Sequence, residues 1–175
     1  MDIKCECGGT MKPVVLENFD FTEMAGIPSS LVGVPGLRCS TCQRETIQGE
    51  VINFALRELA LALGRMPQLL PANGARYLRR YMRLSQQELA ERMGVNRVTV
   101  AKWEGGPDPI SAQHDYMLRG LLVSHAMLDQ KPKRAECVEL AKAIGAVRRD
   151  MSVPPPFVID HFLRQSRGSG ARAAR

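Results

Sequence analysis

Residues 84–106, with the sequence LSQQELAERMGVNRVTVAKWEGG, constrain the fold of this chain more than any other stretch. Ser85, followed three residues later by a glutamate, forms a capping box that predicts a helix over 86–93. Gly94 ends that helix, and a second helix is predicted over 97–104, with Asn96 as its N-cap. Two short helices joined by a tight glycine turn are the arrangement of a helix-turn-helix.

The two predicted helices have a packed side and an open side. The packed side is apolar and consists of Leu89, Ala90, Met93, Val95, Val100 and Trp103. The open side of the second helix shows Arg97, Val98, Ala101 and Lys102. In the major groove of DNA, Arg and Lys reach guanine acceptors, and an apolar side chain meets the thymine methyl group. Gln86 and Asn96, at the helix N-termini, are placed for phosphate oxygens, and Thr99 suits helix packing, a phosphate contact or a base contact.

Other side chains near this run have structural explanations. Arg79 is expected to pair with Glu104 inside the domain rather than to contact DNA, and Trp103 is expected in the core. The remaining arginines of the preceding helix form either a solvated face or contacts to the DNA backbone; they are Arg76, Arg80 and Arg83.

Four of the five cysteines form two close pairs. Cys5 and Cys7 lie in CECGG, and Cys39 and Cys42 lie in CSTC. Two such pairs from separate turns supply the four ligands of a tetrahedral, structural zinc site. The first pair has the spacing C-x-C in place of the usual C-x-x-C. This shorter spacing strains the common chelate geometry and argues against Cys5 as a ligand.

Two alternatives for the cysteines remain open at this point. They are ordinary thiols of a small domain, or Cys39 and Cys42 form an exposed redox pair. Four cysteine ligands would leave no open metal position for catalysis. The sequence also lacks H-E-x-x-H, a phosphate-binding loop and a nucleophile elbow, so no enzyme activity is expected. Cys137 is expected on the apolar face of a helix over 135–149, as a core residue rather than a metal ligand.

The chain is expected to be mainly α, with a small β-rich zinc module followed by an all-α, lambda-repressor-like helix-turn-helix domain and a helical extension. Aromatic residues make up only 5% of the chain, which favours helices over a large sheet. The predicted parts are a zinc-binding module at 1–50, a helix and hinge-like linker at 51–74, the helix-turn-helix domain at 75–128, a helical extension at 129–163 with a short helix at 157–163, and a disordered basic tail at 164–175.

The net charge of +6 is unevenly distributed. Residues 76–103 carry seven Lys and Arg against two Glu, whereas residues 1–75 carry six against eight acidic residues. A basic block suits phosphate contacts, although an ordinary solvated surface has the same composition. The sequence shows no signal peptide and no stretch of membrane-spanning length, so a cytoplasmic protein without a membrane partner is expected.

The run at 84–106 resembles the Xre/Cro-type helix-turn-helix. Together with CECGG and with VGVPGLRCSTC at 32–42, it makes the chain similar to the MqsA/YgiT-type antitoxin family. The resemblance implies a zinc module that binds and neutralises an mRNA-cleaving toxin, a helix-turn-helix that dimerises, and repression of the protein's own operon. The family places Asn and Arg at positions that match Val98 and Lys102, so the operator sequence is not implied. Residues past about 128 fall outside the family pattern.

These inferences predict a homodimer that binds palindromic, double-stranded operator DNA. A two-fold dimer would present two recognition helices to half-sites about one DNA turn apart. The resemblance implies that the protein is an autorepressing antitoxin. The alternative is a stand-alone regulator whose zinc module senses metal or redox state.

Overall fold

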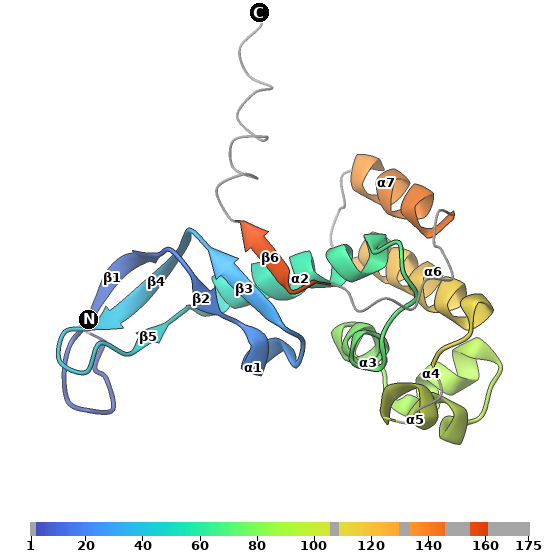
Figure 1. Cartoon of the computed structure of the whole chain (residues 1–175), viewed down its shortest axis with the longest axis horizontal. Helices are drawn as coiled ribbons and strands as arrows, with labels where there is room; N and C mark the ends of the chain where they lie inside the picture. The colour runs from blue at the N-terminus through green and yellow to red at the C-terminus, as the bar shows by residue number, and fades with distance from the viewer. Residues whose placement is uncertain (1–2, 106–108, 130–133, 146–154, 161–175) are drawn as a thin grey trace, which may run out of the picture. The chain divides into compact units, whose positions relative to one another are not determined.

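The computed structural model describes residues 3–105, 109–129, 134–145 and 155–160, with the backbone alone for 127–129, 134–137 and 145. The chain forms two compact units (Figure 1). The N-terminal unit takes in residues up to Leu56 together with the segment from Pro156, and the helical unit runs from Arg57 to Pro155. The basic tail predicted at 164–175 and the side chain of Cys137 lie outside the described residues.

Short strands dominate the N-terminal unit, and helices make up the rest of the described chain. The strands are β1 (Met11–Leu16), β2 (Phe19–Asp20), β3 (Ser29–Val32), β4 (Val34–Cys39), β5 (Glu45–Thr46) and β6 (Phe157–Asp160). The helices are α1 (Thr22–Ala25), α2 (Gly49–Arg65), α3 (Ala72–Tyr81), α4 (Gln86–Met93), α5 (Arg97–Gly105), α6 (Ala112–Asp129) and α7 (Arg134–Gly145). This arrangement confirms the predicted fold class, a mainly α chain with a β-rich N-terminal module.

Strands β1, β4 and β5 form an antiparallel sheet with β4 in the centre. Met11, at the start of β1, lies opposite Cys39, at the end of β4. Proline has no backbone N–H to donate to a neighbouring strand, so in a sheet it needs a position where no strand pairs on that side. Pro13 has one because β1 is an edge strand, and Pro35 has one because β5 pairs only with the far end of β4.

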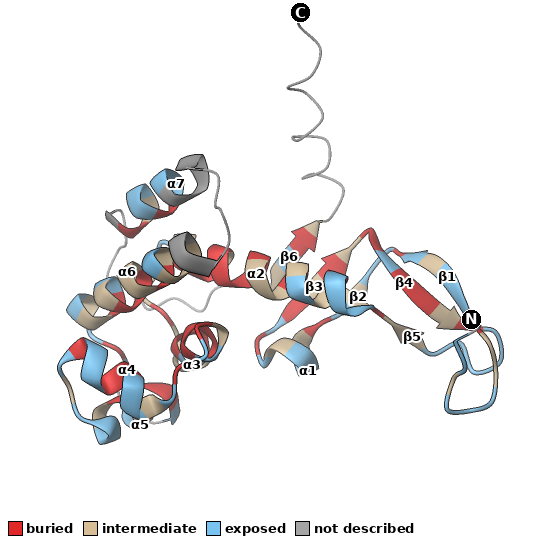
Figure 2. Ribbon diagram, turned by 180° about the vertical axis from the view of Figure 1, so that it is seen from behind, coloured by how far each residue is buried: buried red, intermediate tan, exposed pale blue. Residues whose placement is uncertain are grey.

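A second sheet joins β3 to β2 on one side and to β6 on the other. Strand β6 runs parallel to β3, with Phe157 opposite Ser29. The expectation of a helix over 157–163 is therefore wrong for its described part. The Phe-Val-Ile run suits a strand once the edge of β3 is present to pair with it. Ile159 is the buried side chain of β6. Figure 2 colours parts of β6, β3 and β4 as buried.

The helical unit contains the helices predicted around 84–106, at nearly the predicted bounds. The capping box at Ser85 is present, with both the Ser85 and Glu88 side chains bonded to backbone N–H groups. Gly94 takes a left-handed φ of 66°, a conformation that glycine adopts without a steric penalty. The core beneath these helices contains Leu78, Leu89, Ala90, Met93, Val100, Trp103, Leu118 and Leu122, all buried.

Within the helical unit, one buried arginine fixes the segment that follows α2. Arg119, on α6, is 0% exposed and donates to the backbone carbonyls of Gly64, Met66 and Gln68. Its Nε lies 2.8 Å from Asp115 Oδ2, and the other oxygen of Asp115 accepts from the backbone N–H of Leu70, in the same segment after α2, at 2.9 Å. The stretch that the sequence marked as hinge-like is thus bonded to α6 through its carbonyl groups.

Arg83 supplies a stability prediction. Its φ is 57°, in the left-handed region that costs a side-chain-bearing residue free energy. We expect Arg83→Gly to raise the free energy of unfolding by about 0.5–1 kcal/mol, measured by urea unfolding. As a matched control, Arg80→Gly, within α3, should lower it by up to about 1 kcal/mol. A less stable Arg83→Gly protein would show that the arginine side chain contributes more than the strain costs.

Candidate nucleic-acid interface and metal centre

Helix α5 has one buried side and one side open to solvent. Val100 and Trp103 are 0% and 7% exposed, which confirms the predicted packed face. Arg97 and Lys102 are exposed, and 61% of the surface of Val98 is exposed. The open side therefore places two cations near an apolar side chain, the combination that can bind guanine acceptors and a thymine methyl group in a major groove.

The N-terminus of α5 is capped as predicted. Asn96 Oδ1 accepts from the backbone N–H of Thr99 at 2.8 Å and lies 3.0 Å from Thr99 Oγ1, which also donates to it. Asn96 is exposed and Thr99 is half-buried. The cap fixes both side chains at the first turn of α5, next to the exposed Arg97.

Gln86, the first residue of α4, is held by the end of α5. Its Nε2 donates to Glu104 Oε2 at 3.0 Å, and the side chain is half-buried. An amide nitrogen carries two N–H groups, so this bond uses one of them. The six residues predicted to contact DNA therefore divide into an open face at Arg97, Val98 and Lys102, and a bonded set at Gln86, Asn96 and Thr99.

An ion pair beneath α5 fixes the helix against α3. Arg79 Nε lies 2.6 Å from Glu104 Oε1, and Arg79 Nη2 donates to Oε2 at 2.8 Å, which confirms the predicted pair. A third N–H of Arg79 donates to the Leu84 carbonyl at 2.7 Å. Burial alone would raise the pKa of Glu104, but the hydrogen bonds from Arg79 and Gln86 hold that pKa below its usual value. The pair therefore stays charged in the folded domain.

Two supporting contacts were not foreseen from the sequence. Arg76, read as a surface or phosphate residue, donates to the backbone carbonyl of Glu104. The ring of His114, on α6, lies 4.7 Å from that of Trp103 and is bonded to Ser111 at 2.8 Å. Neither contact leaves a local sequence signal, because each joins residues from different helices.

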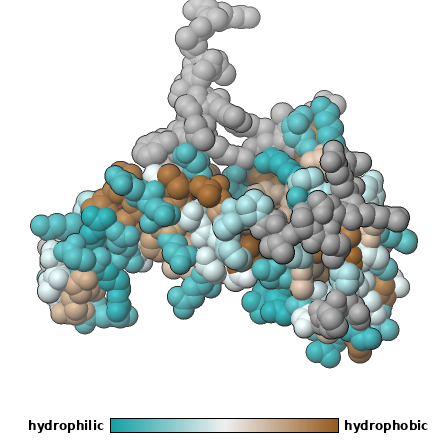
Figure 3. Space-filling view, viewed as in Figure 1, coloured by the Kyte–Doolittle hydropathy of each residue, from teal (hydrophilic) through white to brown (hydrophobic). Residues whose placement is uncertain are grey.

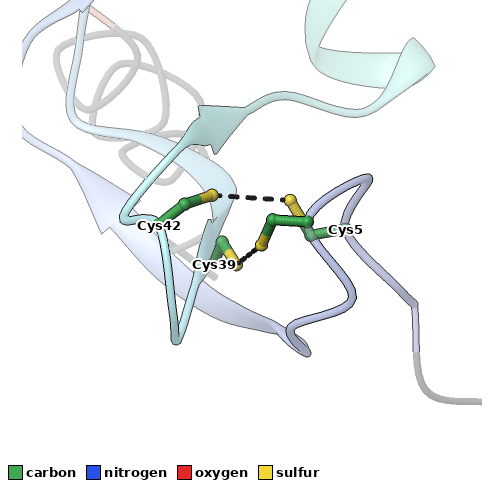
Figure 4. Close-up of side chains that lie close together, drawn as sticks. Cys5, Cys39 and Cys42 are labelled. Atoms are coloured by element: carbon green, nitrogen blue, oxygen red, sulfur yellow. Dashed lines mark hydrogen bonds between the residues drawn. The ribbon is translucent and has the colours of Figure 1, made fainter.

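The four paired cysteines come together in the N-terminal unit. Their Sγ atoms all lie within 4.8 Å of one another. Cys5 Sγ lies 3.6 Å from Cys42 Sγ, and Cys7 Sγ lies 3.5 Å from Cys39 Sγ, so each contact joins the two loops (Figure 4). A tetrahedral zinc site with Zn–S bonds of 2.3 Å has sulfur atoms about 3.8 Å apart. The cluster fits such an ion, Cys5 included.

Backbone geometry explains how the C-x-C pair reaches this arrangement. The N–H of Cys5 donates to the Gly9 carbonyl, and the N–H of Gly8 donates to the Cys5 carbonyl, which closes a tight turn. Gly8 has a φ of 85°, a conformation that glycine adopts without a steric penalty. A Cβ on Gly9 would lie 2.8 Å from Cys39 Sγ, so this position must lack a side chain.

The charge balance of the cluster also fits a cation. Backbone N–H groups of Cys42 and Thr41 lower the pKa of Cys39 to about 6. The backbone N–H of Arg44 acts in the same direction on Cys42, but the neighbouring thiols of Cys7 and Cys39 raise the pKa of Cys42 to about 11. A thiolate at one cysteine thus disfavours ionisation of the neighbouring thiols. A bound divalent cation would offset this repulsion and stabilise all four thiolates.

None of the described helices is both long and apolar enough to cross a bilayer. On the face shown in Figure 3, hydrophilic residues predominate and apolar residues form separate patches. Exposed large apolar side chains include Val15, Met24, Val98, Tyr116 and Val158.

The helices α3 to α6, with the capped and supported α5, define a helix-turn-helix domain of the kind found in DNA-binding regulators. Residues 76–114 match the profile of a helix-turn-helix family of the Xre/Cro type. A comparison of the chain with curated proteins found no match. The chain therefore contains a DNA-binding type of domain together with a four-cysteine cluster able to bind a metal ion.

Proposed function

We propose that this protein is a sequence-specific transcription regulator that inserts α5 into the major groove of an operator. The observation that carries this proposal is the exposed face of α5, where Arg97, Val98 and Lys102 stand on a helix fixed by a buried ion pair. A recognition helix must be held rigidly so that its side chains can distinguish between bases. Gln86, Asn96 and Thr99 are assigned to phosphate and helix-end contacts.

Regulation through palindromic operators requires two copies of this domain. A two-fold dimer would place the two α5 helices about one DNA turn apart, so the half-sites should have that spacing. The seven Lys and Arg residues among 76–103 would provide the salt-dependent part of the affinity. Repression of the protein's own operon is the regulatory outcome that we assign.

Arg97 provides the direct test of DNA reading. We expect Arg97→Ala to weaken binding to DNA from upstream of the protein's own gene by about 1–3 kcal/mol, because a bidentate contact to guanine is lost. The measurement is a mobility shift at fixed salt against random DNA of equal length. Lys142→Ala, an exposed cation on α7, should bind like wild type. Equal weakening on both DNAs would show that Arg97 contacts only phosphate.

We assign zinc to the cysteine cluster, with a structural role. Cys5, Cys7, Cys39 and Cys42 would hold it through four thiolates, which leaves no coordination position for a substrate. The ion would keep the loops that carry the two cysteine pairs together, and so would fix the surface of the N-terminal unit for a partner.

From the resemblance to the MqsA/YgiT-type family we further propose that this surface binds and neutralises an mRNA-cleaving toxin. The test is co-expression with a small basic reading frame adjacent to the gene, followed by growth and co-purification assays. Rescue of growth together with a stable complex supports an antitoxin. Growth arrest that this protein does not relieve would leave a stand-alone regulator, with its DNA binding unaffected.

A further inference from the structure

Helix α6 has one side packed within the helical unit and one side open to solvent. The ring of His114 lies against that of Trp103, and Arg119 donates to carbonyls at the end of α2 and just after it, so both residues mark the packed side. Residues spaced three and four apart on the opposite side are exposed or half-buried. This side, which we call the open α6 face, consists of Gln113, Tyr116, Met117, Gly120 and Ser124.

The open α6 face carries no charged side chain. Residues 112–126 contain one acidic and one basic residue, Asp115 and Arg119, and both are 0% exposed and paired with each other. Charged residues make up 24% of the chain and normally gather on the solvent side of a helix. The centre of a protein–protein interface is depleted in charge and enriched in Tyr and Met. The composition of this face is therefore that of a contact surface.

Gly120 lies in the middle of the open α6 face and has no structural reason within the described chain. A Cβ at this position would meet no described atom within 4 Å, and its φ is not left-handed. Glycine is nevertheless one of the least favourable residues inside a helix. Beside it, Ser124 donates its hydroxyl to the Gly120 carbonyl at 3.2 Å, and Tyr116 is 60% exposed. A second helix could approach the backbone closely at Gly120, with the tyrosine ring packed along it.

Charge decides which partner fits this face. Residues 76–103 of the same unit carry seven Lys and Arg against two Glu, so two copies of the unit repel each other where these surfaces approach. Across a two-fold axis a surface meets itself, and any charge near the axis then faces its own sign. An uncharged face avoids this repulsion. The open α6 face is thus a surface on which two basic copies can meet.

We propose that the open α6 face joins two copies of this protein, with the two α6 helices crossing at Gly120. The Tyr116 ring of each copy packs against the helix of the other. This inference rests on the proposed function, which requires two copies of the DNA-binding domain, and it names the surface that holds them together.

Gly120→Lys tests this interface in the full-length protein. The side chain has room in the single chain and lysine is a better helix former than glycine, so each copy should fold as before. In the dimer, two new like charges would face each other across the axis. We expect the dissociation constant of the dimer to rise about a hundredfold or more, measured by sedimentation equilibrium. Val138→Lys, at a side chain 44% exposed on α7, adds the same charge elsewhere and should leave the dimer intact.

Three results would overturn the proposal: a wild-type protein that is monomeric at every concentration, a Gly120→Lys protein that stays dimeric, or a dimer that Val138→Lys dissociates equally. If Gly120→Lys does not fold by circular dichroism, Tyr116→Lys takes its place with the same outcomes. A mobility shift of wild type separates this inference from DNA reading. A monomer that still prefers its own upstream DNA would refute only the interface. A dimer without that preference, dissociated by Gly120→Lys, would support the interface and refute only DNA reading.

Discussion

Replacing Glu104 with alanine is expected to lower the free energy of unfolding of the helical unit by about 3–5 kcal/mol. The guanidinium group of Arg79 would stay buried without its carboxylate, and Gln86 would lose its acceptor. Trp103, the only tryptophan, directly precedes Glu104 and is 7% exposed, so its fluorescence reports this unfolding. Urea unfolding of the two proteins gives the difference. Operator affinity should fall with it, because α5 loses its support.

The matched control removes both charges. Arg79→Met combined with Glu104→Leu should unfold within about 1 kcal/mol of wild type, since neither charge is then left buried alone. A loss below about 1 kcal/mol for Glu104→Ala by itself would show that water reaches the guanidinium group and that the pair is an ordinary surface one.

The same pair gives a pH dependence. The pKa of Glu104 is lower in the folded domain than in the unfolded chain, so the folded state favours the charged form. Its contribution to stability is complete above the ordinary glutamate pKa and is lost as the pH falls through the lowered value. Glu104→Gln should therefore flatten the acid side of the stability profile. An unchanged profile would mean that other carboxylates dominate it.

Replacing Cys39 with serine should abolish binding of the proposed zinc ion and unfold the sheet formed by β1, β4 and β5. Cys39 is 0% exposed and ends β4, and structural zinc sites contribute on the order of 10 kcal/mol to the folding of small modules. The measurements are zinc content by atomic spectrometry and hydrogen exchange of the β1 and β4 amides. Removal of zinc from wild type by a chelator should give the same exchange pattern.

Cys137→Ser is the control, since Cys137 is predicted to be a core residue rather than a ligand. It should keep the full metal content. A Cys39→Ser protein that retains both zinc and a protected sheet would contradict a structural role for the cluster. Loss of zinc from Cys137→Ser would contradict the ligand set.

The parts of the fold that the sequence predicted well have local causes. The capping box at Ser85, the glycine turn at Gly94 and the Asn96 cap each act within a few residues, and all three occur at the expected positions. The pairing of Arg79 with Glu104 was also predictable, because a charged residue at the end of a packed helix needs a partner nearby. The cysteine pairs predicted their own cluster, and the tight turn at Gly8 is what brings the unusually spaced first pair into it.

The parts that could not be predicted depend on distant partners. In the sequence, Arg119 looks like a surface arginine of an amphipathic helix. Only the tertiary structure places it against the carbonyl groups at the end of α2 and just after it. Residues 157–160 form a strand because the β3 edge is there to pair with, and no feature within the segment identifies that edge. Contacts between elements, rather than propensities within them, decided both outcomes.

The long separation of β3 and β6 along the chain also dictates an order of folding. A ribosome releases β3 early and β6 only after every helix of the helical unit has been made. Contacts between neighbouring helices form quickly, whereas pairings across a long intervening chain form slowly. We therefore expect the helix-turn-helix to acquire its shape during synthesis, and the sheet of β2, β3 and β6 to be completed afterwards, when residues 157–160 pair with β3.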